Sequence, residues 1–261
     1  MEQMIDNIYR VTCPYQDIYT TVYIIKTEQG TLLFDAASYP SDVDEYIAPA
    51  LTECGVDTVD YIFISHNHRD HAGALSVLRE RYPEATIVSR CPKLKAAYGD
   101  TPFLAPENGD RLLDVLQVVT IPGHTADAAA ILDTRTGTLI SGDCLQLYGI
   151  FGSGKWAANI TLIPEHLQAV LDLYHLPIDR IYTAHDYHPC GHVFEGSGAI
   201  TKALRSCIEP LGKIVVLINQ HPEMNDEEIA ALYNEADLPT LGAHVVAAVR
   251  TVDWGTLKLR R

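Results

Sequence analysis

The stretch Val59–Gly73, VDYIFISHNHRDHAG, joins the pattern of a buried strand to a polar loop. Its first half, VDYIFIS, is a continuous apolar run of strand length, which predicts a strand covered on both faces. Its second half places His66, His68, Asp70 and His71 within six positions, in a chain with 11 histidines in total. Imidazoles and carboxylates are the usual ligands of zinc and similar metals. Four such side chains directly after a buried strand predict a metal site rather than a solvated polar loop.

The spacing within the loop suggests how the four side chains divide. His66 and His68 are two residues apart, so both side chains point the same way in an extended segment. Asp70 and His71 fall where the chain is expected to turn into a helix. One loop could therefore serve two adjacent metals, with His66 and His68 toward one metal and Asp70 and His71 toward the other.

Three further ligand-type residues lie far along the chain, each after an apolar strand pattern. His124 lies in TIPGHTAD, Asp143 in LISGDCLQ and His185 in IYTAHDYHP. Each short motif alone is weak evidence for a functional site, because such sequences more often form simple turns. Together they are informative, because the ends of neighbouring strands meet at one edge of a sheet, which is a common place for α/β active sites.

The rest of the chain reads as alternating strands and helices, which predicts an α/β fold with helices covering sheet faces. Besides the run at 59–65, we expect strands at 8–11, 21–26, 31–35, 86–88, 116–121, 128–132, 138–141 and 180–184. We expect helices at 41–54, 72–82 and 164–174, and another beginning near Gly198. Past about Val215 two helical patterns follow. We therefore predict a main domain over residues 1–215 and a small helical extension over residues 216–261.

Composition limits the classes of partner. The chain has a formal net charge of -15, with 47% hydrophobic and 20% charged residues. A strongly acidic chain lacks the basic footprint of nucleic-acid binding, so no nucleic acid is expected as a partner. There is no apolar run of membrane-spanning length and no secretory pattern at the N-terminus, so we expect no membrane association. The six scattered cysteines favour reduced thiols and a cytoplasmic location.

The order HxHxDH, later His, later Asp, last His closely resembles the signature of the metallo-β-lactamase superfamily, and all seven positions match. The resemblance runs from about Asn7 to Val215. It implies a four-layer αβ/βα sandwich with two metals at one edge. Carried over position by position, His66, His68 and His124 would hold the first metal. Asp70, His71 and His185 would hold the second, with Asp143 bridging the two.

This resemblance implies a dinuclear metal-dependent hydrolase, with zinc the first expectation and manganese or iron the alternatives. Two cations that share a water make hydroxide available near neutral pH. Asp70 and Asp143 would be the catalytic carboxylates, because Asp70 could orient the nucleophile and Asp143 would set the metal separation. Members of the family that reduce oxygen or nitric oxide carry Glu in place of His68, so that branch is disfavoured. We expect a small ester, thioester or lactone as the substrate.

Several alternatives stay open at this point. The site also resembles that of phosphodiesterases and of persulfide dioxygenases with one iron, and a ligand-binding protein of low turnover could keep the same residues. Gly149–Trp156 has the spacing of a phosphate-binding loop but lacks the Ser or Thr after Lys155. We interpret it as a loop, either at the rim of the site or packed on the surface. The helical tail could form a homo-oligomer interface or a wall of the pocket. The candidate substrate contacts are Tyr148, Phe151, Lys155, Trp156 and His188.

Overall fold

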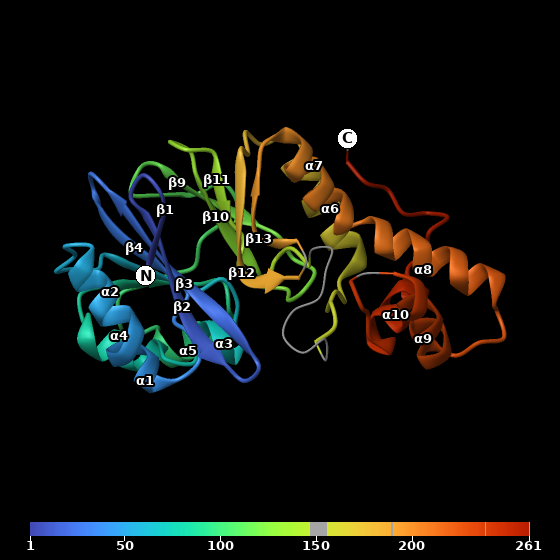
Figure 1. Ribbon diagram of the computed structural model, residues 1–261, viewed down its shortest axis with the longest axis horizontal. Coiled ribbons are helices and arrows are strands. Elements are labelled where there is room, and N and C mark those ends of the chain that lie inside the picture. Colours follow the sequence, from blue (N-terminus) through green and yellow to red (C-terminus); the bar gives the residue numbers. More distant parts are fainter. Residues whose placement is uncertain (147–155, 189, 238, 261) are drawn as a thin grey trace.

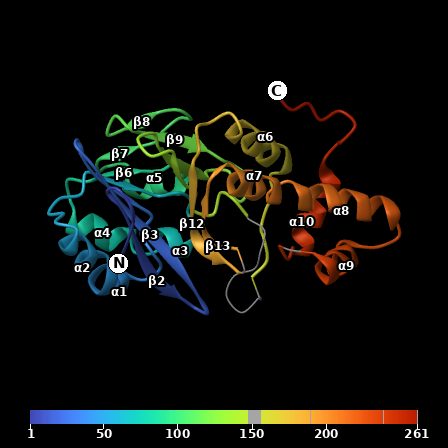
Figure 2. The same cartoon turned by 45° about the horizontal axis from the view of Figure 1, so that its top comes forward.

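The computed structural model describes residues 1–146, 156–188, 190–237 and 239–260. Two mixed sheets form its centre (Figures 1 and 2). The seven-stranded sheet has the order β1-β2-β3-β4-β5-β6-β7, antiparallel as far as β4 and parallel from there on. Its strands are β1 (Glu2–Ile5), β2 (Ile8–Tyr15), β3 (Ile18–Thr27), β4 (Gly30–Phe34), β5 (Tyr61–Phe63), β6 (Thr86–Val88) and β7 (Phe103–Leu104).

The second sheet has six strands in the order β13-β12-β11-β10-β9-β8. Only the β11–β12 pair is parallel, and the other pairs are antiparallel. Its strands are β8 (Arg111–Leu112), β9 (Leu116–Thr120), β10 (Ala129–Asp133), β11 (Thr138–Ile140), β12 (Arg180–Tyr187) and β13 (Gly191–Glu195).

Alternating side chains bury both faces of the central strands. In β4, Phe34 packs between the two sheets, whereas Leu33 packs under the helices on the outer face. In β5, Phe63 and Ile62 divide in the same way. The prediction of a strand covered on both faces is therefore confirmed, although β5 itself is shorter than the apolar run.

Helices cover the outer face of each sheet, so the predicted αβ/βα sandwich is confirmed. The first sheet is covered by α1 (Pro40–Asp42), the π-helical turn η1 (Val43–Ile47), α2 (Ala48–Glu53), α3 (Arg69–Ala72), α4 (Leu75–Arg81) and α5 (Pro92–Tyr98). The second sheet is covered by α6 (Ile163–Leu173) and α7 (Ser197–Ser206). The helix expected over 72–82 corresponds to α4, which begins at Leu75, and the short helix α3 precedes it.

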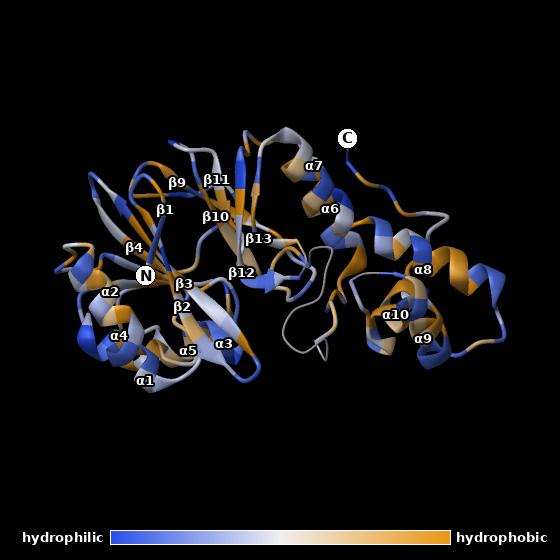
Figure 3. Ribbon diagram, in the orientation of Figure 1, coloured by the Kyte–Doolittle hydropathy of each residue, from blue (hydrophilic) through white to orange (hydrophobic). Residues whose placement is uncertain are grey.

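Three further helices lie at one end of the molecule: α8 (Glu209–Gln220), α9 (Asp226–Ala236) and α10 (Ala243–Thr251) (Figure 1). Each presents apolar and polar stretches (Figure 3). Their shared apolar cluster also takes in Ile160, Ile163 and Leu167 from the segment before and within α6. The predicted boundary at residue 215 falls inside α8, so that helix belongs to both predicted parts. No helix in the described ranges is long and apolar enough to cross a membrane.

Candidate metal centre

The seven predicted ligand residues come together in two adjacent groups. His66, His68 and His124 form the first group, and Asp70, His71, Asp143 and His185 form the second. Within each group, one candidate ligand atom from each residue lies within 4.8 Å of the others. Six of the seven side chains belong to buried residues, and His68 is half-buried. The structure therefore brings together, from four separate segments, the residues that the sequence singled out.

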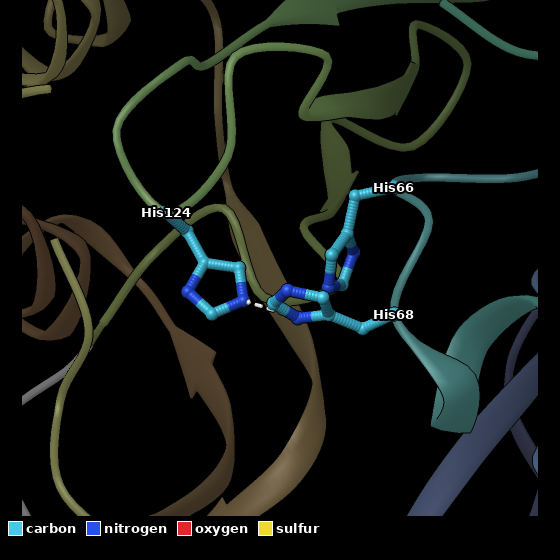
Figure 4. A group of neighbouring side chains, drawn as sticks. All are labelled: His66, His68 and His124. Atoms are coloured by element: carbon cyan, nitrogen blue, oxygen red, sulfur yellow. Dashed lines mark hydrogen bonds between the residues drawn. The ribbon is translucent and has the colours of Figure 1, made fainter. Parts of the chain in front are cut away.

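The first group consists of three imidazoles that face one another (Figure 4). His68 Nδ1 lies 3.0 Å from His124 Nε2. The ring centroid of His66 is 4.5 Å from that of His68 and 4.9 Å from that of His124. Three converging imidazoles are a ligand set that suits zinc and other transition metals.

Asp143 lies between the two groups. Its Oδ1 is 3.2 Å from His185 Nε2, and its Oδ2 is 3.4 Å from His71 Nε2 and 3.8 Å from His124 Nε2. Asp70 Oδ2 is 3.3 Å from both His71 Nε2 and His185 Nε2. One carboxylate thus approaches imidazoles of both groups, as a bridging ligand would.

Most of these side chains lie in loops that directly follow a strand. The first loop follows β5, His124 follows β9 and Asp143 follows β11. His185 is the exception, because β12 continues to Tyr187 rather than ending near residue 184. The sheet pairing of β12 with β13 is irregular between Tyr182 and Tyr187.

Two glycines permit the close approach of the backbone segments. A Cβ at Gly73, which ends the first loop, would lie 2.1 Å from the Ser38 carbonyl oxygen. Gly142, directly before Asp143, has φ +52°, and a Cβ there would lie 2.8 Å from Ser65 Oγ. Side chains other than hydrogen are excluded or strained at both positions, so these glycines help to fix where the loops carrying Asp70 and Asp143 meet.

A buried carboxylate behind the centre orients His71. Asp35 Oδ2 accepts a hydrogen bond from His71 Nδ1 at 2.7 Å, which leaves Nε2 facing Asp70 and Asp143. Asp35 also accepts from the Ser65 amide at 2.8 Å and from Ser65 Oγ at 3.0 Å. Its backbone has φ 66°, an uncommon conformation for a residue other than glycine. Carboxylates that fix a ligand histidine in this way are typical of metal sites.

Backbone carbonyls hold two further ligand rings. His185 Nδ1 donates to the Tyr19 carbonyl at 2.6 Å, and His124 Nδ1 donates to the Asn159 carbonyl at 2.9 Å. In both residues Nε2 is thereby left toward the centre. A hydrogen bond donated by Nδ1 therefore sets the ring orientation in each of His71, His124 and His185.

Hydrogen bonds of Gln146 and Asn159 form a bridge between the loop of Asp143 and the backbone segment that holds His124. Gln146 Nε2 donates to the Asp143 carbonyl at 2.9 Å, while its Oε1 accepts from the Asn159 amide at 3.0 Å. Asn159 Oδ1 is in turn 2.9 Å from His244 Nε2 on α10. The bridge links Asp143 and His124 to the C-terminal helices.

The electrostatics of the centre couple carboxylates to imidazoles. Burial alone would lower the pKa of His71, but Asp70, Asp143 and Asp35 together raise it well above its usual value. Burial is likewise outweighed at His185, where Asp143 and Asp70 raise the pKa to about 10. Burial would raise the pKa of both Asp70 and Asp143, yet the neighbouring histidines hold both well below the usual range.

Two imidazoles of the first group, those of His66 and His124, behave in the opposite way. Burial lowers the pKa of His66 well below its usual value and also lowers that of His124, with the nearby imidazoles adding to both effects. These rings are therefore neutral at neutral pH, which is the state that binds metals. His66 and His124 are thus held in the neutral form, whereas His71 and His185 are paired with the carboxylates of Asp70 and Asp143.

Buried polar atoms at the centre fit a bound cation. Within the described ranges, His66 Nε2, His71 Nε2 and Asp143 Oδ1 are buried without a hydrogen-bond partner of good geometry. Such atoms are costly, because burial removes water without replacing its hydrogen bonds. Divalent metals coordinated by His66 Nε2 in the first group and by His71 Nε2 and Asp143 Oδ1 in the second would remove that cost, so the residues present fit the metals that the ligand pattern implies.

The predicted substrate contacts are less well placed. Tyr148, Phe151 and Lys155 lie outside the described residues. Trp156 Nε1 donates to Asp17 Oδ1 at 2.9 Å, and its ring centroid is 6.3 Å from that of Tyr15, next to the β2–β3 turn. His188 is exposed and belongs to neither of the two ligand groups.

The supporting residues Asp35, Gln146 and Asn159 were not identified from the sequence. Asp35 had a usable signal, because it ends the apolar strand TLLFD just as Ser65 ends YIFIS. Gln146 and Asn159 had none, because their roles depend on a contact between segments that only the tertiary structure brings together.

Comparisons with known proteins agree with this arrangement. Uncharacterized protein YobT of Bacillus subtilis is 30% identical over an alignment of 162 positions that covers 52% of this chain and 67% of that protein. Hydroxyacylglutathione hydrolase of Thermosynechococcus vestitus is 31% identical over 147 residues, 55% of each chain. The alignments thus span about half to two thirds of these relatives.

Solved structures share the fold. The metallo-beta-lactamase family protein TTHA1429 of Thermus thermophilus superposes with a TM-score of 0.65 at 17% identity, covering 95% of this chain and 92% of that one. The model of the metallo-beta-lactamase superfamily matches residues 16–185, the range that holds all seven ligand-type residues. This chain therefore belongs to the metallo-β-lactamase superfamily.

Proposed function

We propose that this protein is a dinuclear metal-dependent hydrolase that cleaves a small ester, thioester or lactone. The observation that carries the proposal is the convergence of seven ligand-type side chains into two adjacent groups with Asp143 between them. His66, His68 and His124 would hold one metal, Asp70, His71 and His185 the other, and Asp143 would contact both. The relative named hydroxyacylglutathione hydrolase supports hydrolysis as the reaction type.

Two divalent metals bound there would supply a water of lowered pKa as a nucleophile near neutral pH, together with Lewis-acid polarisation of the substrate oxygen. The chain's own residues would position this water and the substrate. Asp70 and Asp143 are the carboxylates of the centre, and their low pKa keeps both ionised as hydrogen-bond acceptors. Asp70 would use its second oxygen to orient the attacking water toward the substrate carbon.

Burial at the centre favours this chemistry. The side chains of Asp70 and Asp143 are only 12% and 10% exposed. Fixed charges at such a site act more strongly than they would in water, and they require little reorganisation during the reaction.

Metal analysis combined with a substrate panel tests the proposal. Purified protein should contain about two zinc or manganese ions per chain, and it should hydrolyse at least one ester, thioester or lactone. Asp143→Ala should remove most of that activity. His175 is exposed just after the end of α6 and belongs to neither ligand group, so His175→Ala should keep the activity. About one iron per chain with oxygen consumption would contradict the proposal and indicate a persulfide dioxygenase. Cleavage of phosphodiesters alone would contradict the substrate class.

A further inference from the structure

A cleft of about 500 Å³ opens directly beside the first ligand group. His68 lines it, together with Arg90 and Lys93 from the segment after β6 and Asp127 from the loop that carries His124. His68 is also the least buried of the seven ligand-type residues. The cleft is large enough for a small organic ligand, so a molecule bound at the metal centre could extend into it.

The charges on the wall of this cleft differ from those of the whole chain. The protein carries a formal charge of -15, whereas the cleft is lined by two cations and one carboxylate. Arg90 Nη1 donates to the Pro106 carbonyl at 2.9 Å and lies 3.7 Å from the exposed carboxylate of Glu107. These contacts hold the guanidinium in place and offset part of its charge.

Lys93 is the cation that remains available. It is exposed, and no hydrogen bond or ion pair engages its ammonium group within the part of the chain that the structure describes. Asp127 is the only acidic residue among the described residues that line the cleft, and it comes from the other loop. An anionic group that binds on the α5 side of the cleft would therefore meet Lys93 and Arg90 first.

We propose that this cleft binds a carboxylate of the substrate, with Lys93 and Arg90 as the recognition residues. The substrate would then be a small carboxylate-bearing ester, thioester or lactone whose scissile bond lies at the metal centre. This assignment of substrate class rests on the proposed function, but the binding of the carboxylate can be measured without turnover.

Two thiols that differ in one group provide the probe. A thiolate binds zinc, and 3-mercaptopropionate adds a carboxylate that 3-mercapto-1-propanol lacks. Titration calorimetry on the zinc-loaded full chain should give a Kd roughly fivefold lower for the carboxylate, the size expected for exposed charge pairs. Lys93→Glu should abolish or reverse that preference, and Arg90→Gln should reduce it. Asp127→Asn should increase it.

Lys95→Glu is the matched control. Lys95 lies on the same helix, α5, and is exposed, but it does not line the cleft. The Lys95→Glu substitution makes the same change in net charge as Lys93→Glu, but it should leave the preference for the carboxylate intact. An equal loss in both variants would show a long-range effect of net charge and would overturn the proposal. Equal affinity of the wild type for both thiols, or binding of neither, would overturn it as well.

A second measurement is independent of metal. Succinate titrated into chelator-treated protein should shift the His68 imidazole resonances in the wild type and in Lys95→Glu but not in Lys93→Glu. Loss of that difference would contradict the carboxylate site. If the preference is found and no ester, thioester or lactone is hydrolysed, the proposed function fails while the binding site stands.

Discussion

The carboxylate of Asp35 determines which nitrogen of His71 faces the metal centre. It is fully buried and accepts from His71 Nδ1 at 2.7 Å. His71 is recognisable from the sequence because four ligand-type residues cluster in one loop. Asp35 is harder to recognise, because an isolated Asp after a strand is usually a turn residue. The ligands were thus predictable from local pattern, whereas the residue that orients one of them depends on contact between β4 and the loop after β5.

Replacement of Asp35 should lower the metal affinity by more than the accompanying loss of folding stability explains. Asp35→Asn keeps the shape but removes the charge that holds the His71 ring, so we expect metal affinity to fall by roughly 10–100-fold. Competition with a chromophoric chelator measures this. Asp42→Asn is the matched control, because Asp42 is buried and accepts from the Ser38 and Tyr39 amides instead. Equal affinity losses in the two variants would argue against an orienting role for Asp35.

His166 should make the protein sensitive to acid. It is fully buried, Nε2 donates to the Cys207 carbonyl at 3.1 Å, and burial lowers its pKa from 6.5 to about 4. The folded state therefore takes up this proton less readily than the unfolded state, and stability is lost as the pH falls through the range from about 6.5 to about 4. Between pH 7 and pH 5 this one group should cost about 2 kcal/mol.

Urea unfolding of chelator-treated protein at pH 7 and pH 5 tests this expectation. His166→Gln cannot take up a proton in this range, so its free energy of unfolding should fall by about 2 kcal/mol less than that of the wild type between the two pH values. Equal losses in wild type and variant would show that His166 does not contribute to acid sensitivity.

At the scale of elements, regular patterns were predictable and irregular ones were not. The runs at β4, β5, β9 and β11 have the composition of buried strands, and the structure confirms them. Strand β13 was missed because GHVFE follows a segment rich in His, Pro and Cys that reads as a loop. Helix α8 was missed because EPLGKIVVLINQ contains a β-branched run that weakens the helical pattern. Both depend on packing against neighbours for their stability.

The bridge through Gln146 connects the loop of Asp143 with the segment before α6. Gln146 is buried and its amide makes one hydrogen bond to each side. Gln146→Leu would leave the Asn159 amide and the Asp143 carbonyl without these partners. We expect a stability loss of about 1–3 kcal/mol and weaker metal binding at the group that contains His124.

His244→Ala distinguishes the contribution of the His244 contact from that of the Gln146 hydrogen bonds. It removes the contact of α10 with Asn159 Oδ1 but keeps the Gln146 hydrogen bonds. Its metal affinity, measured by chelator competition, should lie between those of the wild type and Gln146→Leu. A wild-type affinity in Gln146→Leu would show that the bridge has no part in placing His124 or Asp143.

At the scale of the whole molecule, two sheets bring distant segments to one edge. The order of ligand-type residues in the sequence was sufficient to predict this arrangement, because each motif adjoins an apolar run, although His185 lies inside β12 and not after it. The reach of the C-terminal helices could not be predicted in the same way. Their apolar cluster takes in residues before α6, and His244 reaches the neighbourhood of His124 through Asn159. Asn159 and His244 are 85 residues apart in the sequence, and no local pattern encodes their contact.

The metal content of Asp70→Ala tests the central claim most directly. Asp70 belongs to the second ligand group and lies 3.3 Å from both His71 and His185. With folding verified by circular dichroism, elemental analysis should give about two metals per chain for the wild type and for His188→Ala. Asp70→Ala should give about one, with most of the hydrolytic activity lost. Two metals and full activity in Asp70→Ala would contradict the dinuclear account.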